Sequence, residues 1–104
     1  MRVGVEHVED CPSWEPVVAN VQEAARLLGM SVEVESHLIS TVEQARERGF
    51  TGSPTIRLDD VDPFARPGDE AALACRLYAT PSGPAGLPTV EQIADALRAW
   101  SARR

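Results

Sequence analysis

Apolar and polar residues recur along the chain with two different periods, and the change of period predicts the elements. Alternation at residues 2–5 predicts a short strand. From Val17 to Leu28 the apolar positions recur every three or four residues, which predicts a helix that ends at Gly29. Residues 31–39 alternate again, and because one of their sides is polar, they predict an edge strand.

Caps and turns divide the middle of the chain. Ser40 and Glu43 fit the capping-box pattern, in which the cap side chain and the residue three positions later satisfy each other's backbone N–H groups. This pattern opens a short helix that we expect to stop at Gly49. Residues 55–58 then predict a third strand.

The last third of the chain begins with a loop and ends with a helix. Residues 59–74 contain prolines and a glycine that keep them irregular, and residues 75–80 predict a fourth strand. After a turn at 81–88, Thr89 and Gln92 form a second capping box, which opens a final amphipathic helix.

The resulting order is β-α-β-α-β-β-α. Strands that are separated by helices are expected to pair in parallel, and the last two strands, joined by a loop, to pair antiparallel. The prediction is therefore an α/β fold with a mixed four-stranded sheet flanked by helices, in a single domain that spans residues 1–104.

Composition narrows the function classes. The 104 residues are 43% hydrophobic and 25% charged, values typical of a globular domain. The net charge of −6 argues against nucleic acid and anionic membranes as partners, which both select clustered positive charge. No segment approaches the roughly 18 apolar residues of a membrane span, and the first residues lack the apolar run of a signal peptide, so we expect a cytoplasmic location.

The segment Cys11-Pro12-Ser13-Trp14, at the start of the first helix, resembles the active-site box of the thioredoxin and glutaredoxin superfamily. It matches that family's Cys-x-x-Cys at the first position and departs at the last, where Trp14 replaces the second cysteine. The resemblance implies a thioredoxin-like fold with Cys11 as the catalytic nucleophile. A dithiol cycle needs a second cysteine to resolve the mixed disulfide, so the box by itself supports only a one-thiol route.

The segment Ser53-Pro54-Thr55 matches the place where that family has a cis-proline facing the reactive cysteine. A cis bond there would leave the Ser53 backbone free to pair with an extended peptide or thiol ligand. More narrowly, the chain is similar to short bacterial thioredoxin-like proteins with Cys-Pro-x-Trp, Gly-Ser-Pro-Thr and Cys-Arg-x-Tyr, some described as alkylmercury-lyase-like. The residues expected to bind substrate are Pro12, Ser13, Trp14, Ser53, Pro54 and Thr55.

Opposing effects act on Cys11. A helix that begins near residues 11–13 directs free N–H groups at the sulfur and favours the thiolate. Four acidic residues close in sequence disfavour a further negative charge. The choice between a reactive thiol and an inert buried one therefore stays open here. The four acidic residues are Glu6, Glu9, Asp10 and Glu15.

Cys75 opens the predicted fourth strand. In the plain thioredoxin topology this point is remote from Cys11, which favours a structural role. The long loop 59–74 could instead carry Cys75 towards the active end. There it would be a resolving thiol, or the two sulfurs with Asp10 could bind a soft cation or cleave a carbon–mercury bond.

Three further features can be interpreted either as functional or as purely structural. Trp14 either covers a recognition groove or packs against the core. His7 either acts as a base or metal ligand or is a loop histidine without a function. The acidic run 59–62 lacks the glycine and the distal glutamate of a calcium loop, so we interpret it as a solvated turn. We expect no cofactor and no resident metal.

Three functions remain open. The first is a thiol-dependent activity centred on Cys11, either monothiol reduction or capture of low-molecular-weight thiols, with a small thiol or a disulfide-bearing peptide or protein as partner. The second is a redox-silent module that binds a peptide or partner subunit with the same fold. The third is thiol-based handling of metals or organomercurials. Whether the chain is an enzyme stays undecided at this point, as does its oligomeric state.

Overall fold

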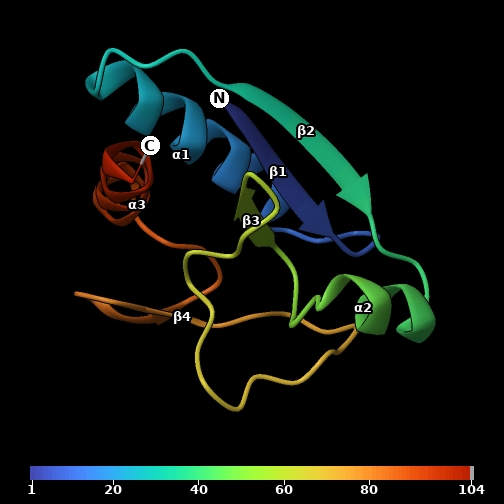
Figure 1. Ribbon diagram of the computed structural model, residues 1–104. Coiled ribbons are helices and arrows are strands. Elements are labelled where there is room, and N and C mark those ends of the chain that lie inside the picture. Colours follow the sequence, from blue (N-terminus) through green and yellow to red (C-terminus); the bar gives the residue numbers. More distant parts are fainter. Residues whose placement is uncertain (104) are drawn as a thin grey trace.

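The structure, a computed structural model, describes residues 1–103 of the chain. Its elements run in the order β-α-β-α-β-β-β-α, with one strand more than predicted. Figure 1 shows them in sequence colours. The elements are β1 (Arg2–His7), α1 (Trp14–Leu27), β2 (Glu33–Leu38), α2 (Val42–Arg48), β3 (Thr55–Leu58), β4 (Tyr78–Thr80), β5 (Gly83–Ala85) and α3 (Val90–Ala102).

The main sheet has three strands in the order β2-β1-β3, so the expectation of an edge position for β2 is confirmed. β1 and β2 are parallel, with Val5 opposite Ser36. β3 is antiparallel to β1, with Ile56 opposite Val5. The expected parallel pairing of strands separated by helices is thus wrong for β3.

The length of α2 explains this antiparallel pairing. β2 ends at the end of the sheet where Leu38 lies opposite His7, and α2, with seven residues, rises only about 10 Å. A helix this short cannot carry the chain back along the sheet. β3 therefore starts at the same end, where Thr55 lies opposite Glu6, and runs in the reverse direction.

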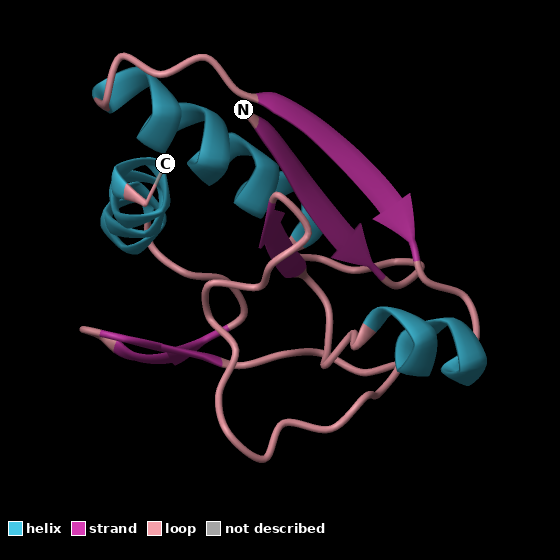
Figure 2. Cartoon of the chain, viewed as in Figure 1, coloured by secondary structure: helices cyan, strands magenta, loops and turns pink. Residues whose placement is uncertain are grey.

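The predicted four-stranded sheet is also wrong. β4 pairs only with β5, in a separate two-stranded antiparallel sheet. The residues before β4 instead run beside residues 50–53, with the Ala72 N–H donating to the Phe50 carbonyl oxygen at 3.1 Å. Figure 2 shows how much of the chain between β3 and β4 is loop.

The two long helices share one face of the sheet. α1 and α3 pack on each other and on the apolar side of β1 and β3, and form the core, so the sheet is covered by long helices on one side only. The opposite side is polar, with a hollow of about 380 Å³ lined mainly by charged residues. The buried core residues are Val3, Val5, Val17, Val21, Ala24, Ala25, Ile56, Leu58, Ile93, Ala94 and Leu97.

The N-termini of α2 and α3 are both capping boxes. Thr89 and Gln92 cap α3 as predicted. The cap of α2 is one residue later than predicted, with Thr41 and Gln44 in place of Ser40 and Glu43. Within the described residues, no helix combines the length and the apolar character needed to cross a bilayer.

Candidate thiol site

Cys11 is a free, partly exposed thiol in the loop between β1 and α1. The helix does not begin at Cys11: Ser13 is its N-cap and Trp14 its first residue. The sequence predicted a start near residues 11–13, so Cys11 lies two residues before the cap rather than in the first turn. The Trp14 N–H donates to the Cys11 carbonyl oxygen at 3.4 Å, which closes a turn ahead of the helix.

The expected acidic surroundings of Cys11 are weaker than the sequence implied. Glu6 is completely buried on the polar side of the sheet and is held by two arginines. Its oxygens lie 2.5 Å from the Arg48 Nη2 and 3.0 Å from the Arg57 Nε. Because these cations neutralise Glu6, its charge does not act on Cys11 as the spacing in sequence suggested.

Ser53 connects two loops of the site. Its hydroxyl accepts a hydrogen bond from the Val8 N–H at 3.0 Å, in the loop that leads to Cys11. Its own N–H donates to the Ala74 carbonyl oxygen at 2.7 Å, and its carbonyl oxygen accepts from the Arg76 N–H at 3.0 Å. The Ser53–Pro54 bond is cis, as the resemblance implied. The expectation of a free Ser53 backbone is wrong, because residues 74–76 of the same chain occupy it.

Cys75 is brought to this site by the long loop. It lies directly opposite Ser53 in an isolated parallel bridge, and its thiol is exposed. Residues that are directly opposite in a bridge present their side chains to the same side. The Ser53 hydroxyl accepts from the Val8 N–H, so Ser53 and Cys75 lie at the end of the sheet where the chain leaves β1 towards Cys11. The expectation that Cys75 lies remote from this end is wrong.

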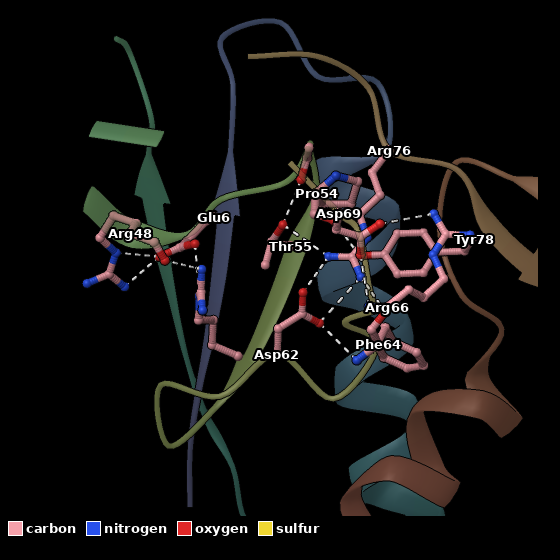
Figure 3. A network of polar contacts seen from close by, with 12 residues as sticks. Glu6, Arg48, Pro54, Thr55, Asp62, Phe64, Arg66, Asp69, Arg76 and Tyr78 are labelled. Atoms are coloured by element: carbon pink, nitrogen blue, oxygen red, sulfur yellow. Dashed lines mark hydrogen bonds and ion pairs between the residues drawn. The ribbon is translucent and has the colours of Figure 1, made fainter. Parts of the chain in front are cut away.

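Tyr78 closes the site behind Pro54. Its hydroxyl donates to the Pro54 carbonyl oxygen at 2.5 Å (Figure 3). Burial raises the pKa of Tyr78, a nearby Arg76 charge lowers it, and the charges of Asp62 and of an ionised Cys11 raise it. The phenol therefore keeps its proton at neutral pH and stays a donor.

Arg76 fixes the backbone that carries Cys75. Its guanidinium is buried, with one nitrogen 2.7 Å from an Asp62 oxygen and another 2.7 Å from the Phe64 carbonyl oxygen. It also lies over the Tyr78 ring, 4.6 Å from the centroid. Figure 3 shows Asp62, Phe64 and Tyr78 gathered around Arg76.

Gly52 allows this segment to come close. Its φ of +140° is one that residues with a side chain rarely adopt, and a Cβ there would lie 2.8 Å from the Cβ of Arg76.

Thr55, expected to bind substrate, is fully buried, and its hydroxyl donates to the Gly52 carbonyl oxygen at 2.6 Å. Thr55 therefore supports the strand entry from inside, and its expected contact with substrate stays a prediction.

Trp14 is tied to the sheet. Its ring stacks on His7 with centroids 4.2 Å apart, and its indole N–H donates to the Ser36 hydroxyl at 3.1 Å. These contacts favour the packing interpretation of Trp14.

The His7 Nδ1 lies 3.1 Å from the Val8 carbonyl oxygen. A carbonyl oxygen can only accept a hydrogen bond, so this nitrogen carries a proton.

Pro12 and Ser13 form the turn between Cys11 and the first residue of α1. Pro12 is exposed, and Ser13 lies against the loop after β5, since a Cβ at Gly86 would come within 2.6 Å of the Ser13 hydroxyl. Their roles in substrate binding stay predictions.

Across residues 1–103, no three His, Cys, Asp or Glu side chains gather closely enough to hold a metal ion, so Cys11, Cys75 and Asp10 form no ready metal site.

Sequence reasoning gave no role to Arg76 or Tyr78, and its interpretation of residues 59–62 as a solvated turn is wrong for Asp62, whose side chain is 7% exposed and paired with Arg76. Arg76 and Tyr78 were visible as part of the Cys-Arg-x-Tyr pattern, but a pattern does not show that the arginine turns inward.

In comparisons with protein-family models, with curated proteins and with solved structures, no match to this chain was found.

Proposed function

We propose that the protein exchanges disulfides of low-molecular-weight thiols, with Cys11 as the attacking thiol in a thioredoxin-like fold. The Cys11 thiolate attacks one sulfur of a small disulfide, forms a mixed disulfide with it and releases the other half as a thiolate. An external thiol then attacks the mixed disulfide and restores the Cys11 thiolate. Each round converts one disulfide and one thiol into another such pair, so no further oxidant or reductant is needed.

One observation carries the proposal: the loop that leads to the partly exposed Cys11 is bonded to Ser53 through the Val8 N–H. The Tyr78 hydroxyl donates to the Pro54 carbonyl oxygen on the next residue of the same segment. Both contacts agree with a thiol beside the Ser53–Pro54 segment, which the resemblance to thioredoxins and glutaredoxins implies.

The Ser53 backbone favours a small substrate over an extended peptide. A peptide that added a strand at this position would need the Ser53 N–H and carbonyl groups, as in other cases of strand addition. Both groups are already bonded to Ala74 and Arg76. A disulfide of two small thiols needs only access to the sulfur of Cys11.

The test uses Cys75→Ser, in which Cys11 is the sole cysteine. After incubation with glutathione disulfide, intact mass should show one glutathione adduct in this variant and none in the Cys11→Ser/Cys75→Ser double variant. Absence of the adduct would contradict the proposal and favour the redox-silent binding module.

A further inference from the structure

The two cysteines of the chain lie on loops that meet at one residue. Ser53 receives the Val8 N–H from the loop before Cys11 on its hydroxyl, and holds the residues on either side of Cys75 with its backbone. Cys75 is therefore fixed at both neighbours, Ala74 and Arg76, while its own thiol stays exposed. The tether leaves the Cys75 side chain free to react and sets the side on which it emerges.

The surrounding contacts keep this segment in place. The Arg76 guanidinium and the Asp62 carboxylate are 4% and 7% exposed, so water does not compete for their ion pair. Residue 52 is a glycine against which the Arg76 Cβ packs closely. Two buried contacts and two backbone hydrogen bonds therefore hold the segment on either side of Cys75 in place.

The Cys11 side of the pair is less constrained. Residues 12 and 13 form a turn rather than helix, and the Cys11 carbonyl oxygen accepts only a long hydrogen bond, of 3.4 Å, from Trp14. A thiol on such a turn can approach a partner that is held firmly. A disulfide requires the two Cα atoms to be within about 7 Å of each other. The Cys11 turn is closed by this one long hydrogen bond, whereas the Cys75 segment is held by two shorter ones.

We propose that Cys75 is the resolving thiol of Cys11. This inference rests on the proposed function, because it needs a mixed disulfide on Cys11. The Cys75 thiolate attacks the Cys11 sulfur of that mixed disulfide, a bond forms between the two cysteine sulfurs, and the small thiol leaves as a thiolate. The substrate disulfide is thereby fully reduced to two thiols, and the two cysteine thiols of the protein are oxidised to one disulfide.

The experiment incubates wild type, Cys75→Ser and Cys11→Ser with glutathione disulfide at low protein concentration, with an alkylating quench and intact mass. Wild type should pass through the glutathione adduct to a species without glutathione that has lost two hydrogen atoms. Cys75→Ser should retain about tenfold more adduct, because an intramolecular thiol acts at a millimolar effective concentration. The conversion should be first order and independent of protein concentration, which excludes a disulfide between two copies.

The control moves the second thiol to another exposed turn. In Cys75→Ser/Ser82→Cys the chain again has two cysteines, but the new one lies in the β4–β5 turn. This variant should retain the adduct as Cys75→Ser does. If wild type retained the adduct to the same extent, Cys75 would not be a resolving thiol although Cys11 reacts. If Cys75→Ser formed no adduct, the proposed function itself would fail.

Discussion

Glu6 and Arg76 are both buried charges, but they stabilise different parts of the molecule. Glu6 lies on the polar side of the main sheet and joins β1 to two arginines, at the end of α2 and on β3. Arg76 lies behind Pro54 and joins the irregular segment that carries Cys75 to Asp62 and Tyr78. Figure 3 shows the two groups on either side of β3.

The difference between them is how far water reaches the partners. Arg48 is 46% exposed and can turn to solvent if Glu6 is removed, and Arg57, 12% exposed, keeps its hydrogen bond to the Arg48 carbonyl oxygen. The Arg76–Asp62 pair, in contrast, is enclosed on both sides. Breaking an enclosed pair leaves a charge that neither water nor protein satisfies. We therefore expect the Arg76 group to matter more for stability and to be the one that affects the thiols.

The largest effect is expected for Asp62→Asn. Because Arg76 would stay buried without its carboxylate, the free energy of unfolding should fall by about 3–5 kcal/mol. Urea unfolding followed by circular dichroism measures this loss. Asp95→Asn, which breaks the exposed pair with Arg98, is the matched control and should cost less than about 0.5 kcal/mol. Equal losses in the two variants would contradict the comparison.

A smaller effect is expected for Glu6→Gln. The amide still accepts one hydrogen bond, and the half-exposed Arg48 regains water, so the loss should be on the order of 1–3 kcal/mol. The rate of glutathione adduct formation on Cys11, measured in the Cys75→Ser background, should not change. A faster reaction would show that the Glu6 charge does act on Cys11. It would then contradict the expectation that only the Arg76 group affects the thiols.

The smallest effect on stability is expected for Ser53→Ala, which removes the acceptor of the Val8 N–H. The cost of that hydrogen bond is about 1 kcal/mol. The formation of the Cys11–Cys75 disulfide should nevertheless slow, because the Cys11 loop loses its tether. Ser36→Ala also removes one hydroxyl acceptor, that of Trp14, and serves as the control for rate. An unchanged rate in Ser53→Ala would mean that the tether does not position Cys11.

The local elements of the fold could be predicted, whereas the way the strands pair could not. The end of α1 at Leu27, two residues before the left-handed Gly29, and the cap at Thr89 both depend on neighbouring residues, and both follow from the sequence to within two residues. The first capping box was misplaced because Ser40 and Thr41 are each followed three residues later by a suitable side chain. The direction of β3 depends on where a short helix lies in space, and periodicity does not contain this information.

The motifs of the site could be predicted from the sequence, whereas the contacts that hold the Cys75 segment in place could not. Cys11 and Pro54 were recognised because each belongs to a short pattern. Residues 75–80 were expected to pair as a strand, but the structure buries Arg76 and leaves Leu77 61% exposed. An apolar pattern cannot predict this inversion, since it depends on Asp62 and the Phe64 carbonyl, which the loop brings into contact.

The close approach at Gly52 has an evolutionary consequence. A side chain at position 52 would displace Arg76 and, with it, the backbone on either side of Cys75. Substitutions at positions 52 and 76 are therefore not independent, because a side chain at position 52 meets the Cβ and backbone of residue 76. In an alignment of descendants of the same ancestral gene, the two columns should change together.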